Sequence, residues 1–244
     1  MKTSGIQASR KVGSTSRSRS VRWFVAVVAG CAGIVAAGLA GQPFPDDPTW
    51  VLCLGGIGLL AGATSVRFPK LGTSFAPTEP FVLVGLCVAG PWAAVAVAVA
   101  AVPGRLMIGR MRPLQFAFNV FASLASAGGA ALAFLGSGGL PGAEPSTQML
   151  PLLIAAAVFL LLNGSLVAAV VALAENRSLV ATLKSVLLRL APASAVAPAL
   201  ALALVFTFDG ALLWAGALAA FGFAATLLLF AIGAPGSSSR AKVR

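Results

Sequence analysis

The stretch FVLVGLCVAGPWAAVAVAVAAVPGRLMIGRMR, residues 81–112, decides how this chain is threaded. Its apolar part, 81–102, is long enough to cross a membrane once as a helix, but Gly90-Pro91 lies near its middle. Proline removes a backbone donor and clashes with the preceding turn, and glycine tolerates the resulting break. A single crossing would also carry the arginines of 105–112 to the far side. The stretch therefore predicts a helical hairpin, broken at Gly90-Pro91, that enters and leaves on one side of the membrane.

The positions of the basic residues support this hairpin. All 17 Lys and Arg residues fall into five clusters between long apolar stretches: 2–22, 67–70, 105–112, 177–189 and 240–244. Cytoplasmic loops retain Lys and Arg, so the clusters label the inner side. With the hairpin every cluster lies inside, and the acids Asp46, Asp47, Glu144 and Asp209 lie outside. The rival threading takes 81–102 as one crossing with an external N-terminus, and it puts six positive charges on the wrong face.

The sequence thus predicts an all-α, polytopic transmembrane helix bundle of about six full spans plus the broken hairpin. Each half of the hairpin has about ten residues, or about 15 Å of helix, so the hairpin is re-entrant or forms two thin crossings. We expect a basic disordered cytoplasmic tail over 1–22, a transmembrane domain over 23–232 and a basic cytoplasmic tail over 233–244. Residues 176–189 are amphipathic and are expected to lie on the inner surface. The predicted full spans are 23–40, 51–66, 114–135, 149–174, 190–208 and 211–232.

Composition limits the class of protein and its partners. The chain is 59% hydrophobic and only 9% charged, which excludes a soluble globular domain. The net charge of +11 sits in juxtamembrane clusters, so we expect anionic lipid headgroups as partners rather than nucleic acid. Histidine is absent, so the usual proton shuttle and commonest metal ligand are missing. We therefore predict no enzyme, no metal site and no cofactor. The basic clusters at both ends predict that both termini lie on the cytoplasmic side.

Glycines and cysteines within the apolar stretches have structural interpretations. Gly58 and Gly62 form a small-xxx-small pair that would let a neighbouring helix approach closely. Cys31, Cys53 and Cys87 are expected to be small buried apolar residues. Cys31 also ends a Val-Ala-Gly-Cys segment that fits a bacterial lipid-modification box, although the chain stays apolar after it.

Polar residues within the apolar segments are candidates for a binding site, because intramembrane polar groups are costly. Asn119 and Asn163 either bridge neighbouring helices through their amides or face a shared cavity that binds a polar ligand group. Glu79 precedes Pro80 at the mouth of the hairpin. It either pairs with Arg67, Lys70 or Arg105, or it forms part of a ligand site or proton-coupled element. The candidate ligand-binding residues are Glu79, Asn119, Asn163 and Arg67.

Several short motifs carry a family resemblance over most of residues 51–232. They are Arg67-Phe68-Pro69, Ser74-Phe75, the Gly90-Pro91 break, Arg112-Pro113, Phe118-Asn119 and Leu162-Asn163. In these the chain resembles the N-terminal multi-helix membrane sensor module of bacterial signalling proteins with GGDEF or HD-GYP output domains. The apolar run centred on Gly90-Pro91 is also similar to substrate-binding subunits of energy-coupling-factor vitamin transporters. No output domain is present in these 244 residues.

The first resemblance implies a non-enzymatic sensory or ligand-binding module of a bacterial cytoplasmic (inner) membrane that signals through a partner protein. The second implies a small-molecule permease subunit whose partner would be an energising ATPase. In either case the small-molecule ligand is unknown.

Overall fold

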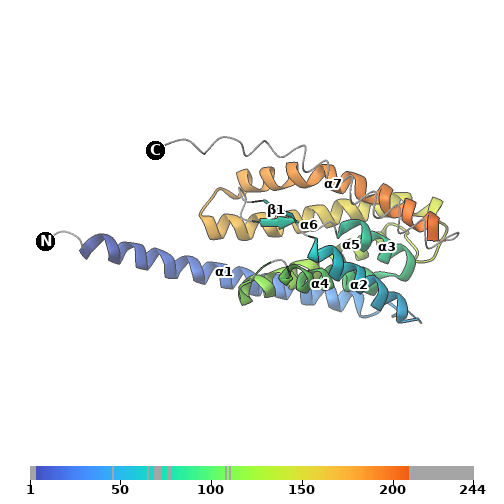
Figure 1. Cartoon of the computed structure of the whole chain (residues 1–244), viewed down its shortest axis with the longest axis horizontal. Helices are drawn as coiled ribbons and strands as arrows, with labels where there is room; N and C mark the ends of the chain where they lie inside the picture. The colour runs from blue at the N-terminus through green and yellow to red at the C-terminus, as the bar shows by residue number, and fades with distance from the viewer. Residues whose placement is uncertain are drawn as a thin grey trace.

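The computed structural model describes residues 4–45, 47–64, 66–68, 73–75, 78–107, 109 and 111–208. In these ranges the chain is helical apart from loops and one short antiparallel pair of strands, so the predicted all-α class is confirmed. The helices run side by side along the long axis of the molecule (Figure 1). The elements are α1 (Ser4–Leu39), α2 (Thr49–Ala63), β1 (Val66–Phe68), β2 (Thr73–Phe75), α3 (Glu79–Ala89), α4 (Pro91–Leu106), α5 (Pro113–Gly136), the 3-10 helix η1 (Pro145–Gln148), α6 (Met149–Glu175) and α7 (Leu179–Phe208).

Helices α3 and α4 form a hairpin, and its break lies at Gly90-Pro91, the dipeptide that the sequence indicates. Gly90 has φ 83° and ψ −168°, a conformation that a residue with a side chain rarely adopts. Pro91 follows as the first residue of α4, where its missing N–H costs no helical hydrogen bond. Helices α3 and α4 then pack against each other, with Gly85 of α3 against the backbone of Ala93 and Ala94.

Helix α2 lies parallel to α4 with almost no side-chain layer between them. A Cβ on Gly58 would overlap the backbone of Val97, and one on Gly62 would overlap the backbone of Ala101. Gly104 of α4 makes the same approach to the backbone of Leu59. The predicted role of Gly58 and Gly62 is therefore confirmed, and the partner helix is the second half of the hairpin.

The N-terminal end of the described chain differs from the sequence prediction. Residues 4–22, expected to be disordered, continue α1 as helix, because no proline interrupts 4–39 and an existing helix propagates easily. Figure 1 shows this part of α1 extending past the other helices. The expected span 211–232 and the tail 233–244 lie outside the described residues.

The segment expected to lie on a membrane surface is instead the start of a longer helix. Residues 179–208 form the single helix α7, with no break between the predicted surface helix 176–189 and the predicted span 190–208. Gly164 of α6 explains the difference, because its missing side chain admits Leu187 and Val186 of α7. Val186 is buried, so this part of α7 packs on α6.

Three of the described helical segments are long and apolar enough to cross a membrane: 19–39, 113–136 and 146–175. The other described apolar helices are shorter, and α2, α3 and α4 are among them. The predicted bundle of apolar helices is therefore present, while the count of six full spans is not established.

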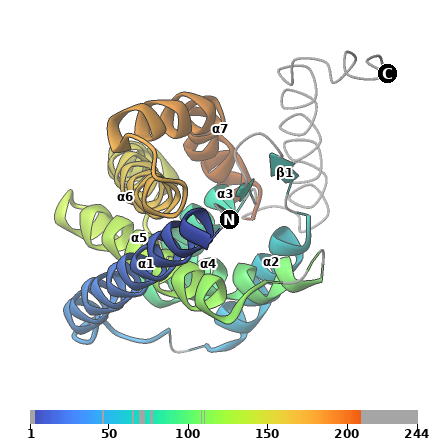
Figure 2. The same cartoon turned by 90° about the vertical axis from the view of Figure 1, so that its left-hand side faces the viewer.

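The main hydrophobic core surrounds the hairpin. It joins α3 and α4 to residues 127–134 of α5, 152–159 of α6 and 197–204 of α7. A smaller cluster of Val25, Val28, Phe118 and Ala122 joins α1 to α5 farther along the bundle. Figure 2 looks along the bundle and shows α3 enclosed among the other helices, with α7 on one side and α4 on the other.

Candidate functional site

The tip of the hairpin is covered by two loops at one end of the bundle, which we call the tip end. Gly142 in the α5–α6 loop donates its N–H to the carbonyl oxygen of Cys87 at 2.7 Å. A Cβ on Gly90 would lie 3.4 Å from Cγ of Pro141 in the same loop. Trp92 donates its indole N–H to the carbonyl oxygen of Gln42, in the α1–α2 loop, at 3.3 Å. The hairpin therefore reaches the level of both loops.

Gln148 holds the α5–α6 loop in the shape that covers the tip. Its side chain is 2% exposed. Its Nε2 donates to the carbonyl oxygen of Leu140 at 3.0 Å, and its Oε1 accepts the N–H of Leu140 at 3.3 Å. One amide side chain thus satisfies both main-chain groups of a loop residue, so the cover over the hairpin is fixed.

The opposite end, where α3 begins and α4 ends, we call the foot end. Glu79 lies in the first turn of α3 and is 5% exposed, beside the buried Thr78. A carboxylate in the first turn is stabilised by the partial positive charge of the helix N-terminus. The predicted candidate Glu79 is therefore a buried acid at the base of the hairpin.

Of the three basic candidates for pairing with Glu79, Lys70 lies outside the described residues, and Arg67 and Arg105 are placed differently. The main chain of Arg67 pairs with that of Ser74 in the β1–β2 ladder, and the structure describes only the main chain of Arg67. Arg105 lies in the last turn of α4, next to the point where α2 ends. Its Nε is buried and has no hydrogen-bond partner among the described residues. The partial negative charges of the two helix C-termini favour a cation at this position.

Asn119 and Asn163 do not lie at the same depth. Asn119 is half-buried near the start of α5, and its Nδ2 donates to Sδ of Met111 at 3.3 Å. Asn163 is half-buried in the middle of α6, next to Leu162, which contacts Gly129 of α5. Because Gly129 is ten residues beyond Asn119, the two asparagines lie on the order of 10 Å apart along the bundle axis. The predicted shared cavity is therefore not formed by these two side chains alone.

Sequence reasoning missed two serines that extend Asn119 into a row. Inside α5 the polar side chains are Gln115, Asn119, Ser123 and Ser126, at intervals of four, four and three residues. Those intervals place all four on one side of the helix. We call this row the polar stripe. The signal was present in the sequence, but serine is common in apolar helices and only the asparagines were singled out.

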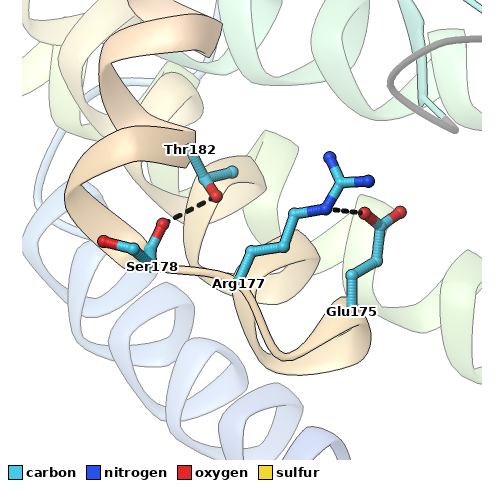
Figure 3. Close-up of polar contacts among 4 residues, drawn as sticks. All are labelled: Glu175, Arg177, Ser178 and Thr182. Carbon is cyan, nitrogen blue, oxygen red and sulfur yellow. Dashed lines mark hydrogen bonds and ion pairs between the residues drawn. The ribbon is translucent and has the colours of Figure 1, made fainter.

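The turn between α6 and α7 at the foot end is polar and exposed. Asn176 ends α6 in the left-handed conformation, with φ 56° and ψ 46°. Glu175 and Arg177 form an ion pair at 2.8 Å, with side chains 36% and 58% exposed, and Thr182 donates to the carbonyl oxygen of Ser178 at 2.8 Å (Figure 3). Exposed pairs of this kind contribute little to stability. We therefore interpret the turn as the end of α6 and the start of α7, without a binding role.

Within the part of the chain that the structure describes, no three His, Cys, Asp or Glu residues gather as a metal site would require. Comparisons of the whole chain with family models, with characterised proteins and with solved structures found no match.

Proposed function

We propose that this chain is a multi-pass protein of a bacterial cytoplasmic membrane, with its foot end on the cytoplasmic side. The charges of the described residues support this orientation. Asp47 and Glu144 belong to the two loops at the tip end. The foot end carries Arg19 and Arg22 of α1 together with the basic residues at the ends of α4, α5 and α6. A surplus of Lys and Arg is the mark of cytoplasmic loops, and anionic lipid headgroups are the expected contacts of these residues.

In this placement the hairpin is a pair of thin crossings rather than a re-entrant loop. Helices α3 and α4 have 11 and 16 residues. They are about 16 Å and about 24 Å long. The contacts of the tip with the α1–α2 and α5–α6 loops support a hairpin that reaches the outer side. A maleimide reagent confined to the outside should label a Trp92→Cys variant without permeabilisation, and labelling of Met107→Cys from outside would overturn the orientation.

We infer that the protein acts as a non-enzymatic ligand-binding or sensory module that signals through a cytoplasmic partner. The observation that carries this proposal is the burial of Glu79, an ionisable group at the base of a broken hairpin. Buried acids within membrane bundles are costly and are retained where they serve binding or proton coupling. Glu79 also lies at the cytoplasmic end in the proposed orientation, where binding could change a surface that a partner contacts.

A permease subunit is the second candidate, favoured by the unequal closure of the two ends. The tip is covered by hydrogen-bonded loops, while polar residues line α5 from the foot end inward. A transporter caught open to one side has this arrangement. Uptake separates the candidates, because a transporter must accumulate a compound in vesicles, whereas a sensor need only bind it.

Thermal unfolding of the full chain in lipid nanodiscs, with and without the low-molecular-weight fraction of a cell extract, tests the ligand-binding proposal. The wild type should unfold at a higher temperature in the presence of the fraction, and Glu79→Gln should lose this response. Glu144→Gln, which removes an exposed acid from the tip end, is the matched control and should keep it. If Glu79→Gln fails to fold, Asn163→Ala replaces it. An equal response of the wild type and Glu79→Gln, or of the wild type and Asn163→Ala where Glu79→Gln does not fold, would refute the ligand-binding role of the substituted residue.

A further inference from the structure

The polar stripe of α5 runs from an exposed end to a fully buried one. Gln115, near the foot end, is exposed, and Asn119 and Ser123 are half-buried. Ser126 is 0% exposed. From Gln115 to Ser126 the stripe covers eleven helical steps, or about 16 Å. Polar side chains thus lead from the foot end to a little beyond the middle of α5.

The stripe faces the interior of the bundle. Gly128 of α5 lies against Val35 and Leu39 of α1, and Gly129 lies against Leu162 of α6. Helix α4 also packs on α5, and Ala127 and Phe134 are fully buried in the core cluster that contains residues of α4. At about 100° per residue the stripe falls between the side that packs on α6 and the side that packs on α4. Ser126, at the inner end of the stripe, is therefore turned away from the surrounding lipid.

Ser126 closes the stripe with an unsatisfied hydroxyl. Its Oγ is buried and has no hydrogen-bond partner among the described residues. Buried hydroxyls nearly always find a partner, and in a helix the carbonyl one turn back is normally available. Beyond Ser126 the interior of α5 is lined by Ala130 and Phe134, both 0% exposed. The stripe therefore ends at a polar group that lacks a partner and faces a packed apolar wall.

A second polar side chain lies at the depth of Ser126. Asn163 follows Leu162, and Leu162 contacts Gly129, which is three residues beyond Ser126. Because α5 and α6 are antiparallel neighbours, Asn163 and Ser126 lie at similar depths on adjacent helices. A molecule that reached Ser126 would thus have an amide within the same layer of the bundle.

We propose that the polar stripe is a binding track, open at the foot end and closed at Ser126, for a small uncharged molecule that carries a hydroxyl or amide group. Gln, Asn and Ser side chains supply both donors and acceptors, which such a molecule needs. None of the four carries a charge, and a charged molecule at this depth requires a counter-charge. The proposal rests on the ligand-binding function above and adds the site and the chemical class of its ligand.

Cysteine accessibility tests the track in a background with Cys31, Cys53 and Cys87 replaced by Ala. Single variants Asn119→Cys, Ser123→Cys and Ser126→Cys are reconstituted and treated with a membrane-impermeant maleimide from the foot side or the tip side. The control Ala130→Cys lies one turn beyond the stripe. We expect foot-side labelling at Ser126→Cys to be at least about tenfold faster than at Ala130→Cys, since a packed thiol is unreactive. Equal rates at these two positions, or faster labelling from the tip side, would overturn the track.

Matched probes then test the chemical class. Acetamide should slow the labelling of Ser123→Cys, whereas acetate and methylammonium, of similar size but charged, should not. Protection by either ion at least equal to that by acetamide would overturn the neutral class. Labelling that no probe slows would show a track filled by water only, and would equally overturn the proposal.

The hydroxyl itself is tested in the native-cysteine protein by Ser126→Ala. Acetamide affinity, read from the shift in unfolding temperature, should fall about two- to tenfold, the effect of losing one neutral hydrogen bond. Ser137→Ala removes a serine at the tip end of α5 that already donates to Ala133 and Phe134, and it should leave the affinity unchanged. Unchanged affinity in Ser126→Ala would remove Ser126 from the site. A track that labels and binds acetamide while Glu79→Gln keeps its response to cell extract would refute the proposed role of Glu79 and leave this inference standing.

Discussion

The two halves of the bundle are built differently around the same hairpin. Toward the tip end, α3 and α4 are packed on every side by apolar residues and covered by loops tied to their main chain. Toward the foot end, the interior contains Glu79, Arg105 and the polar stripe, and the apolar cluster there is small. The tip half therefore resembles a rigid core, and the foot half has the composition of a binding region. We infer from this difference that binding of a ligand should alter the structure of the foot half, while the packed tip half keeps its structure. We call the packed tip half the frame.

The close approach of α2 and α4 offers the strongest way to break the frame. Gly58→Leu would drive a side chain into the backbone of Val97, which cannot rotate out of the way. We expect the unfolding free energy to fall by more than about 4 kcal/mol, among the largest effects of a single substitution. Size-exclusion chromatography and thermal unfolding in detergent measure this loss. Gly55→Leu, one turn closer to the tip, meets open space and should fold normally. Equal behaviour of the two variants would contradict the packing of α2 on α4.

Truncation of the same residue type in each half compares the two directly. Phe134 is 0% exposed in the main core, whereas Phe121 is half-buried beside the smaller cluster. Phe134→Ala should cost about 3 kcal/mol, because it leaves a cavity that rigid neighbours cannot fill. Phe121→Ala should cost less, and the difference can be read from unfolding in mild denaturant. A larger loss for Phe121→Ala would reverse our assignment of the rigid half.

The α5–α6 loop that covers the tip should contribute less to the free energy of unfolding than the core does. Gln148→Ala removes the two hydrogen bonds to Leu140 and should cost about 1–2 kcal/mol. Hydrogen exchange at the α5–α6 loop should accelerate, while exchange in the foot half stays unchanged. Gln42→Ala is the control, because Trp92 binds the main-chain oxygen of Gln42 and not its side chain. If Gln148→Ala left the loop as protected as before, the amide would not be what fixes the cover.

The sequence predicted the frame better than the site, for a physical reason. Gly90-Pro91 and the Gly58–Gly62 pair act through backbone geometry, which follows from residue identity alone. The structure has a helix break at the first and a close helix approach at the second. The ends of the helices were harder to predict from the sequence. The break expected near residue 190 depends on whether α7 packs on α6. Gly164, a residue distant in sequence, decides that contact.

The candidate site could be predicted only in part. Glu79, Asn119 and Asn163 were found because an acid or amide in an apolar segment is conspicuous. The relative depth of Asn119 and Asn163 could not be predicted in this way. It depends on the register between α5 and α6, which is seen in the contact of Gly129 with Leu162. Ser126 stands out only through its burial and its lack of a partner.

The smallest expected effect is a pH dependence of the unfolding temperature that comes from Asp47 at the tip end. It concerns a surface charge, whereas Glu79 in the foot half is buried. Hydrogen bonds from the side chain and main-chain N–H of Thr49 lower the pKa of Asp47 from its ordinary value of 3.8, with the N–H 2.9 Å from Oδ1. Since the pKa of Asp47 is lower in the folded state, its stabilising contribution is present above the unfolded value and is lost as pH falls through the folded value. The unfolding temperature of the wild type should therefore exceed that of Asp47→Asn slightly near neutral pH, and the gap should close below about pH 4. Asparagine can still accept the N–H of Thr49, so the comparison isolates the charge. A gap that grew on acidification would mean that the charge of Asp47 destabilises the start of α2.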